Sequence, residues 1–440
     1  MFTLEQALRY AAEHYPTLRG ALEQVNAATA GVAVARSGYL PRLDSLWQSN
    51  RATANNIFGQ VLPQSVVPAM SGPVLPSTSS QTVWGSVAGA LFSWEPFDFG
   101  LRGATVAGAE ATVARARADQ VLTLLDVEHA VGAAFLAAAA SERAVMAAQA
   151  DLDRRDVLAR TAHALADSQL RPGAEASRAD AERAAARTRL IRARQQLTVA
   201  QAALARTLGI ADAVTIDSTG VVGTVPAPID SPLGAPSRHP LAIARQAAVD
   251  AARAQETVLA RTDLPRVYLE SSVFARGSGA DPTGTLDGGI SGLGLDRTNW
   301  AGGVQVVFPN LFDFPSLRAR RAASAATTRA ERARYDEAML TIASEQQEAR
   351  ATVEASRAIA ANTPVQLAAA QQSEEQARAR YQAGLASIVE VADAQNLLAQ
   401  AEYEDEVARV DVWRALLAEA VARGDLAPFI GMVRAGTGAR

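Results

Sequence analysis

The chain has 440 residues, of which 5% are aromatic, contains no cysteine and carries a formal net charge of −4. So low an aromatic content argues against a thick globular core, and the absence of cysteine excludes disulfides and thiol chemistry. Acidic residues and arginines are interspersed along the chain, which argues against a nucleic-acid-binding protein.

The beginning of the chain does not have the pattern of a secretory signal, because residues 1–16 include Glu5, Arg9 and Glu13. We therefore expect that an exported form has already lost its signal, and a lipid-anchoring cysteine is absent from the sequence as written. The longest apolar run, at 130–140, has about eleven residues and is mostly alanine, whereas a spanning helix needs roughly 18. The sequence predicts no transmembrane helix.

An internal repeat is the strongest feature of the sequence. Residues 14–44 match residues 238–268, and similar residues continue to correspond at a separation of roughly 220. The corresponding positions include Pro16 and Pro240, Pro41 and Pro265, Gly209 and Gly424, and the Phe-Asp-Phe triplets at 97–99 and 312–314. We infer two copies of one unit that differ in their loops.

Each copy has the pattern helix, strand, loop, strand, very long helix, turn, helix. The first, 1–213, has strands at about 42–51 and 82–94, a long helix at about 101–168 and a return helix at about 172–208. Residues 214–236 form a linker beside the helices. The second, 237–430, has strands at about 266–276 and 299–308, a long helix at about 317–382 and a return helix at about 386–423, and 431–440 form a tail. We expect Pro364 to kink or restart the second long helix.

The strands have two unlike faces. Leu43, Ser45 and Trp47 alternate with polar neighbours after Pro41, and the copy after Pro265 keeps the same parity. About ten residues is the length a tilted strand needs to cross a bilayer. Tryptophan, typical of membrane interfaces, occurs in or beside the strands at positions 47, 84, 94 and 300. The alternative is an ordinary soluble sheet covered by helices. Because four strands cannot close a barrel and lipid tolerates no open edge, spanning strands require an oligomer.

The helices are far longer than those of a globular domain. The first has no proline from Leu101 to Pro172, so about 67 residues, or roughly 100 Å, can be continuous. The return helix and the helix at about 238–263 together approach that length, so we expect them to stack end to end along it. In a tube whose wall is one helix thick, each helix packs only against the helices on either side of it. Alanine allows close packing at these lateral contacts, which explains the alanine-rich composition. A soluble coiled coil is the alternative, but sustained Leu or Ile heptads are missing.

At this point the residues carry a family resemblance. The opening segment 2–44, the strand-to-helix element 91–104 and the segment 381–425 resemble the TolC-like outer-membrane efflux proteins, in the same order along the chain. The resemblance implies a membrane protein of the α+β class: a homotrimer with a 12-stranded β-barrel, four strands per chain, continued by a long periplasmic α-helical barrel. The Phe-Asp-Phe triplets then mark where strand becomes helix. The implied location is the outer membrane of a Gram-negative bacterium, with the helices extending into the periplasm.

The resemblance also implies a function and two sets of residues. The function is that of a channel-tunnel in a tripartite efflux or type I secretion system, with a periplasmic adaptor and an inner-membrane transporter as partners. The periplasmic constriction would be formed by Glu175, Tyr381, Glu390 and Asp393. The turns would form the docking tip for the adaptor, with Arg171, Pro172, Gly384, Leu385 and Ser387. The resemblance also implies an arginine in this constriction, at the position where this chain has Ala386. We therefore expect the closed state of the periplasmic end to rely on other contacts.

Residues suited to catalysis or metal binding do not cluster in the sequence. The four histidines, His14, His129, His163 and His239, lie far apart in different elements, and no nucleophile or phosphate-loop motif accompanies them. We therefore expect no enzyme activity, no cofactor and no metal. The alternatives to a channel are a soluble periplasmic helical scaffold and a periplasmic adaptor, although the adaptor's small β domains are missing. Exported cargo cannot be inferred from the residues.

Overall fold

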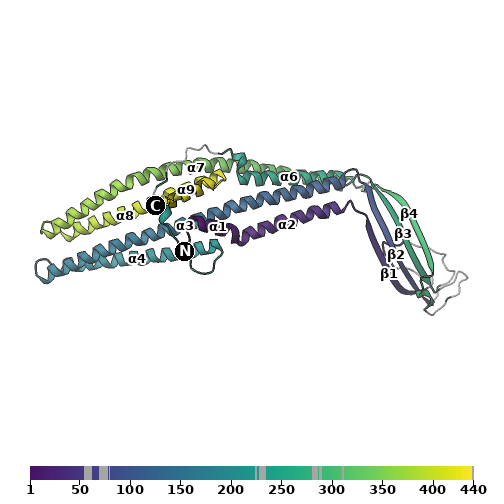
Figure 1. The fold of residues 1–440 in the computed structure, drawn as a ribbon, viewed down its shortest axis with the longest axis horizontal. Coiled ribbons are helices and arrows are strands. Elements are labelled where there is room, and N and C mark those ends of the chain that lie inside the picture. The colour runs from purple at the N-terminus through teal and green to yellow at the C-terminus, as the bar shows by residue number, and fades with distance from the viewer. Residues whose placement is uncertain are drawn as a thin grey trace. The chain divides into compact units, whose positions relative to one another are not determined.

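A computed structural model describes residues 1–53, 62–68, 78, 80–222, 225–226, 234–279, 286, 290–309 and 312–438. The first half of the chain forms α1 (Leu4–His14), α2 (Pro16–Ser37), β1 (Arg42–Thr53), β2 (Thr82–Phe97), α3 (Leu101–Asp167), α4 (Gly173–Leu208) and the short α5 (Thr219–Val222) (Figure 1). The second half forms α6 (Pro240–Arg261), β3 (Arg266–Ser278), β4 (Arg297–Val307), α7 (Phe314–Gln382), α8 (Ile388–Arg423) and α9 (Ala427–Gly438).

The chain folds into two compact units whose boundaries differ from those of the two sequence repeats. A sheet unit comprises residues 27–113 and 249–330, and a helical unit comprises residues 1–26, 114–248 and 331–440. Both units therefore take segments from both copies of the sequence repeat. The division into residues 1–213, 214–236, 237–430 and 431–440 remains a prediction about sequence similarity.

The sheet unit contains one antiparallel sheet in the order β1-β2-β3-β4 (Figure 1). Each strand pairs with the next along the chain, and a register irregularity lies between Trp94 and Phe97 at the end of β2. Within the chain, the outer edges of β1 and β4 pair with no other described strand. Since unpaired edges attract further strands, this sheet is suited to joining copies of itself edge to edge.

The two faces of the sheet differ in chemistry. Leu43 and Trp47 of β1, Val273 of β3, and Trp300 and Val304 of β4 lie on one face and are strongly exposed. We call this the outer face; the parity of the strands places Trp84 and Trp94 on it as well. The opposite, inner face carries most of the charged and amide side chains, including Asp44, Gln48, Glu270, Arg276, Asn299 and Gln305. The alternation expected from the sequence is therefore present.

The first Phe-Asp-Phe triplet lies where β2 ends and α3 begins. Phe99 and Gly100 have positive φ angles of 51° and 90°, and the buried Asp98 carboxylate accepts hydrogen bonds from the backbone nitrogens of Gly100 (3.0 Å) and Arg102 (2.5 Å). The Arg102 Nε donates to it at 2.9 Å. Burial alone would raise the pKa of Asp98, but these hydrogen bonds and the charge of Arg102 outweigh it and lower the pKa. The aspartate thus caps the positive end of the long helix.

In the helical unit, the largest core gathers around α8 and the middle of α3. Phe135, Leu136, Trp413 and Phe429 are almost fully buried there, and Phe429 meets Trp413 edge to face with ring centroids 6.0 Å apart. The amino terminus joins the same core, because Phe2 forms a parallel bridge with Ile216 beyond α4. The first part of the linker between the repeats, residues 214–222, is therefore packed into this core.

Two helix junctions correct the predicted stacking. The left-handed Gly209 (φ 73°) ends α4 beside Tyr15 and Pro16, at the start of α2, and Gly424 (φ 75°) ends α8 beside Pro240, at the start of α6. The return helix of the first repeat thus abuts α2 and not α6. Helix lengths could not show whether α4 stacks on α2 or on α6, because α2 and α6 both have 22 residues.

Both long helices are continuous. α3 has 67 residues, and α7 has 69 and passes through Pro364 without restarting. Beside that proline, the buried Thr363 donates its hydroxyl to Asp405 of α8 at 2.9 Å. An 18-residue window of α3 has a mean hydropathy of 1.6 and could cross a membrane by length and composition alone, although the sequence offers no run of about 18 apolar residues. Of that window, 39% is buried within the fold.

Candidate functional site

The predicted site residues gather at the two turns that join α3 to α4 and α7 to α8. The first turn includes Gln169, whose φ is 59°, and Pro172, which precedes the first residue of α4. The second includes Gly384, whose φ is 77°, and Ser387, which caps α8. All these residues belong to the helical unit.

Gly384 has the backbone conformation that favours glycine. The backbone nitrogen of Gly384 donates to the Tyr381 carbonyl at 3.1 Å, and that of Leu385 donates to the Arg380 carbonyl at 2.8 Å, which closes the end of α7. Side chains other than glycine are strained at such a φ angle. Leu385, next along the turn, is 72% exposed. The turn is therefore held by its backbone and presents an apolar side chain to its surroundings.

Tyr381 connects the second hairpin to the first. Its hydroxyl donates to Oε2 of Glu175 at 2.9 Å, and its side chain is 2% exposed. Burial, the hydrogen bond to Glu175 and the negative charge of that carboxylate raise the pKa of Tyr381 to about 12, against the opposing effect of Arg171. The tyrosine is therefore a neutral donor at physiological pH, and the pair predicted from the family resemblance is formed.

Arg171 completes this contact from the first turn. Its Nη2 donates to the backbone carbonyls of Ala386 (3.2 Å) and Tyr381 (3.4 Å), and its Nη1 lies 3.7 Å from Oε1 of Glu175. The guanidinium also lies 5.1 Å from the centroid of the Tyr381 ring. We call Arg171, Glu175 and Tyr381 the hairpin latch, because these side chains join the two turns.

One contact of the hairpin latch lies where the family resemblance leads us to expect an arginine. That arginine would stand at position 386, where this chain has alanine, and Arg171 reaches the carbonyl of that same residue from the opposite hairpin. Sequence reasoning placed Arg171 only among the docking residues. Its position four residues before Glu175 was a signal for the ion pair with that carboxylate, but not for the contact with the Ala386 carbonyl.

Glu390 and Asp393 lie apart from the hairpin latch. Both are exposed at the start of α8. Glu390 accepts a hydrogen bond from the backbone nitrogen of Ser387 at 3.2 Å and lies 3.8 Å from Nη1 of Arg380. It therefore has a capping role in addition to the charge expected of it, whereas Asp393 presents its carboxylate to solvent. Of the four predicted constriction residues, the structure joins Glu175 to Tyr381 by a hydrogen bond. Glu390 and Asp393 are exposed at the start of α8 and take no part in that contact.

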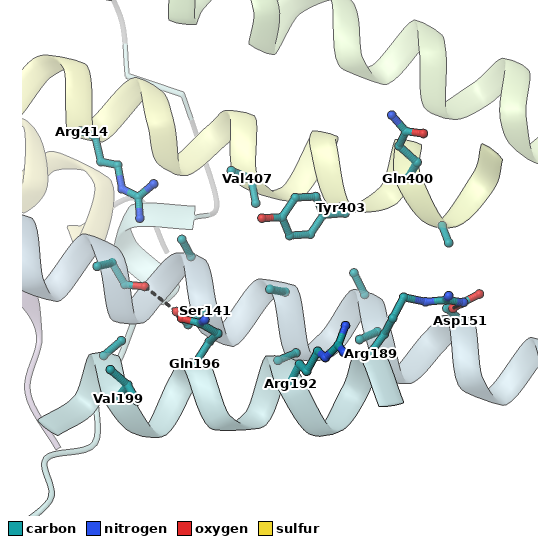
Figure 2. A pocket seen from close by; sticks show the side chains of 18 of the residues that line it. Ser141, Asp151, Arg189, Arg192, Gln196, Val199, Gln400, Tyr403, Val407 and Arg414 are labelled. Atoms are coloured by element: carbon teal, nitrogen blue, oxygen red, sulfur yellow. Dashed lines mark hydrogen bonds and ion pairs between the residues drawn. The ribbon is translucent and has the colours of Figure 1, made fainter. Parts of the chain in front are cut away.

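A second feature, which sequence reasoning missed, is a pocket of about 910 Å³ between α3, α4 and α8 (Figure 2). Alanines make up much of its lining, and Arg189, Arg192 and Tyr403 supply larger side chains. Asp151, at its border, accepts hydrogen bonds from Arg189 Nη2 at 2.8 Å and from the buried Arg155 Nε at 2.9 Å.

Arg155 joins three helices beside that pocket. Its side chain is 1% exposed, and apart from Asp151 it donates to Glu182 of α4 at 2.9 Å and to Asn396 of α8 at 2.7 Å. The neighbouring Arg154 binds both carboxylate oxygens of Glu402 at 2.9 and 2.6 Å. Because a buried guanidinium is stable only when its donors are paired, Arg155 fixes the spacing of α3, α4 and α8. Arg154 and Arg155 follow one another in the sequence, and nothing there distinguished the buried arginine from its neighbour.

Neither catalysis nor metal binding is indicated by the described part of the chain. Within it, no group of three or more His, Asp or Glu side chains could hold a metal ion. Three of the histidines have local partners: His14 stacks on Tyr10, His163 lies 2.9 Å from Asp180, and His239 lies 3.0 Å from the Val421 carbonyl.

Comparison with protein families gives one match over most of the chain. The family model described as "Outer membrane efflux protein" matches residues 7–210 and 235–418, which follow the two sequence repeats. Among curated proteins, Protein CyaE of Bordetella pertussis is 28% identical over 287 residues, covering 62% of this chain and 55% of CyaE. The chain thus matches about half the length of that relative.

Solved structures share the fold at low sequence identity. The outer membrane protein VceC of Vibrio cholerae matches with a TM-score of 0.75 at 18% identity, covering 96% of both chains. The CmeC outer membrane channel of Campylobacter jejuni matches with a TM-score of 0.78 at 15% identity, covering 98% of this chain and 89% of CmeC. The predicted fold class, a four-stranded contribution to a trimeric barrel continued by long helices in two repeats, is confirmed.

Proposed function

The chain belongs to the outer membrane efflux protein family, and from that premise we propose that it is a passive exit duct for substrates delivered by an inner-membrane transporter through a periplasmic adaptor. Three copies join edge to edge and close a barrel in the outer membrane of a Gram-negative bacterium, and their helices form a tunnel in the periplasm. Family and fold are those of channel proteins, and the family match argues against the adaptor and the soluble scaffold.

The observation that carries this proposal is the two-faced sheet with open edges. Its exposed outer face bears Trp47, Val273, Trp300 and Val304, apolar side chains of the kind that face lipid on spanning barrels. A single sheet with unpaired edges is not tolerated in a bilayer, so the four strands require partners. Three identical sheets satisfy both requirements with twelve strands.

At the far end of the hairpins we propose a closed gate. The hairpin latch, Arg171, Glu175 and Tyr381, joins the turn after α3 to the turn after α7, so the hairpins separate only if these contacts break. Glu390 and Asp393 are exposed at the start of α8, which follows the second of these turns. With threefold symmetry they contribute six carboxylates around a narrow mouth, which favours cations.

The same turns form the proposed docking tip for the adaptor. Pro172, Gly384 and Leu385 are exposed, whereas Ser387 is half-buried as a helix cap and the Arg171 guanidinium is turned toward the other hairpin. Because the latch and the tip share the two turns, an adaptor bound there would act directly on the gate. Arg171 then contributes to closure as well as to the tip surface.

The test of the proposed function combines assembly with conductance. The purified chain should run as a trimer in detergent and form cation-selective channels in planar bilayers that divalent cations block. A Glu390→Ala, Asp393→Ala double variant should lose part of both the selectivity and the block. A monomer that stays soluble without detergent would refute the duct, and unchanged selectivity in the double variant would remove these two acids from the constriction.

A further inference from the structure

Part of the connection between β1 and β2 lies on the inner face of the sheet. Within residues 62–68, Val66 and Val67 are 8% and 4% exposed, although they belong to a loop. They form one apolar cluster with Val87 of β2 and Phe274 of β3, and Leu46 and Leu91 pack against it. A loop that leaves the sheet for solvent would not bury two valines in this way.

Gln64 folds this segment into a compact turn. Its Oε1 accepts hydrogen bonds from the backbone nitrogens of Val66 (2.6 Å) and Val67 (2.7 Å), and its Nε2 donates to the Val67 carbonyl at 2.8 Å. A single side chain thus satisfies three backbone groups that would otherwise need water. The turn is preorganised to present both valines to the sheet.

The contact lies well inside the sheet and not at its rim. Val87 is five residues beyond Thr82, where β2 begins, so it lies roughly 17 Å along the strand at about 3.4 Å per residue. Phe274 and Leu46 both pair with Gly89, in a row near the middle of the strands. A Cβ atom on Gly89 would stand 2.6 Å from the Cβ of Phe274, so glycine leaves room for that ring.

The apolar cluster lies on the face that otherwise bears charge. The inner faces of water-filled barrels are polar, and here Glu270 and Gln305 keep that character while the patch around Val87 and Phe274 is covered by the loop. The polar inner residues suit a lumen that contains water, and the apolar patch suits a surface that residues 62–68 cover.

We infer that residues 62–68 form a resident constriction inside the barrel. Each of three protomers places this segment on the lumen side of its sheet, with Val66 and Val67 packed against the wall, so the lumen narrows at mid-depth for hydrophilic solutes that enter from outside. The inference rests on the proposed trimeric barrel but not on the latch, since the loop and the latch belong to different units.

The absence of cysteine makes the position of the loop measurable with introduced thiols. Whole cells carrying Val67→Cys or the matched control Leu62→Cys, which is 55% exposed, are treated with a bulky, membrane-impermeant maleimide. We expect Val67→Cys to react at least about tenfold more slowly, since a buried thiol reacts only from a minor open state. Equal rates would overturn the inference.

A crosslinking pair locates the loop on the correct face. Val67→Cys with Val87→Cys should form a disulfide under mild oxidation, whereas Val67→Cys with Val273→Cys should not, because Val273 belongs to the outer face. Efficient crosslinking to Val273 or none to Val87 would place the loop elsewhere.

A reporter below the loop tests the narrowing itself without involving the gate. Ser93 pairs with Arg42 and Glu270 in an inner row nearer the helices than the cluster. A Ser93→Cys reporter should react slowly with the bulky reagent from outside, and adding Val66→Asp and Val67→Asp should accelerate it by releasing the loop. Fast labelling of Ser93→Cys with the native loop would show that no constriction exists. Reporter chains that are not trimeric would instead contradict the proposed barrel.

Discussion

Replacing Tyr381 with phenylalanine removes one hydroxyl group from the hairpin latch and leaves the ring in place. The hydroxyl donates to Glu175 at 2.9 Å, and the tyrosine side chain is 2% exposed, so water cannot easily replace it. A hydrogen bond to a charged group contributes about 1.5–3 kcal/mol. We therefore expect the closed arrangement to lose an amount in this range in every protomer.

The remaining contact moderates the effect. Glu175 keeps Arg171 at 3.7 Å after the substitution, and Arg171 keeps the Ala386 carbonyl at 3.2 Å, so the lower end of the range is expected. Since about 1.4 kcal/mol corresponds to a factor of ten, the open-to-closed ratio should rise roughly tenfold per protomer. Three latches in one trimer multiply that factor if the hairpins open together.

Single-channel recording in planar bilayers measures this ratio as open probability. Tyr403→Phe is the matched control, because Tyr403 is 49% exposed and its hydroxyl lies at the α3–α4–α8 pocket, away from the latch. Open probability should rise in Tyr381→Phe and stay unchanged in Tyr403→Phe. An unchanged value in Tyr381→Phe would refute the idea that this hydrogen bond holds the hairpins together.

Four further outcomes are expected. Because the pKa of Tyr381 is raised from 10.0 to about 12, its contribution to closure is fully present below pH 10 and is lost as the pH rises through 12; open probability should rise over that window in the native chain but not in Tyr381→Phe. Val273→Arg on the outer face should cost roughly 2–4 kcal/mol and lower trimer yield, whereas Glu270→Arg on the inner face should leave the yield unchanged. Gly384→Leu should abolish export by crowding the docking tip, with trimer yield intact because the φ of 77° strains a side chain by only about 1–2 kcal/mol; Gly20→Leu, at an exposed position of α2 with open space around it, should export normally. Arg155→Met should lower the melting temperature through a loss of about 3–5 kcal/mol, whereas the exposed Arg192→Met should not.

Sequence patterns identified those parts of the fold that local chemistry determines. The Phe-Asp-Phe triplet identified the start of the first long helix because Asp98 caps it, and strand parity identified the outer face because Leu43, Trp47 and Val273 are apolar at alternate positions. The continuity of α7 through Pro364 was missed, because a proline's effect depends on the neighbouring helix, here through Thr363 and Asp405.

The hairpin latch was only half predictable. Tyr381 and Glu175 were inferred from the family resemblance, but Arg171 acts on backbone carbonyls of the other hairpin, and carbonyls leave no mark in a sequence. The turn formed by Gln64 was hidden for a similar reason, since its partners are backbone groups of Val66 and Val67. Contacts of a side chain with distant backbone require the fold before they can be recognised.

The unpaired edges of β1 and β4 have a genetic consequence. The barrel closes only if both sheet edges of every protomer pair with a neighbour, so one subunit with a defective edge prevents closure of the whole pore. If a cell makes native and damaged chains in equal amounts and they mix at random, only about one pore in eight contains three native chains. Mutations at the strand edges that still permit association should therefore be dominant, whereas mutations that prevent any association should be recessive.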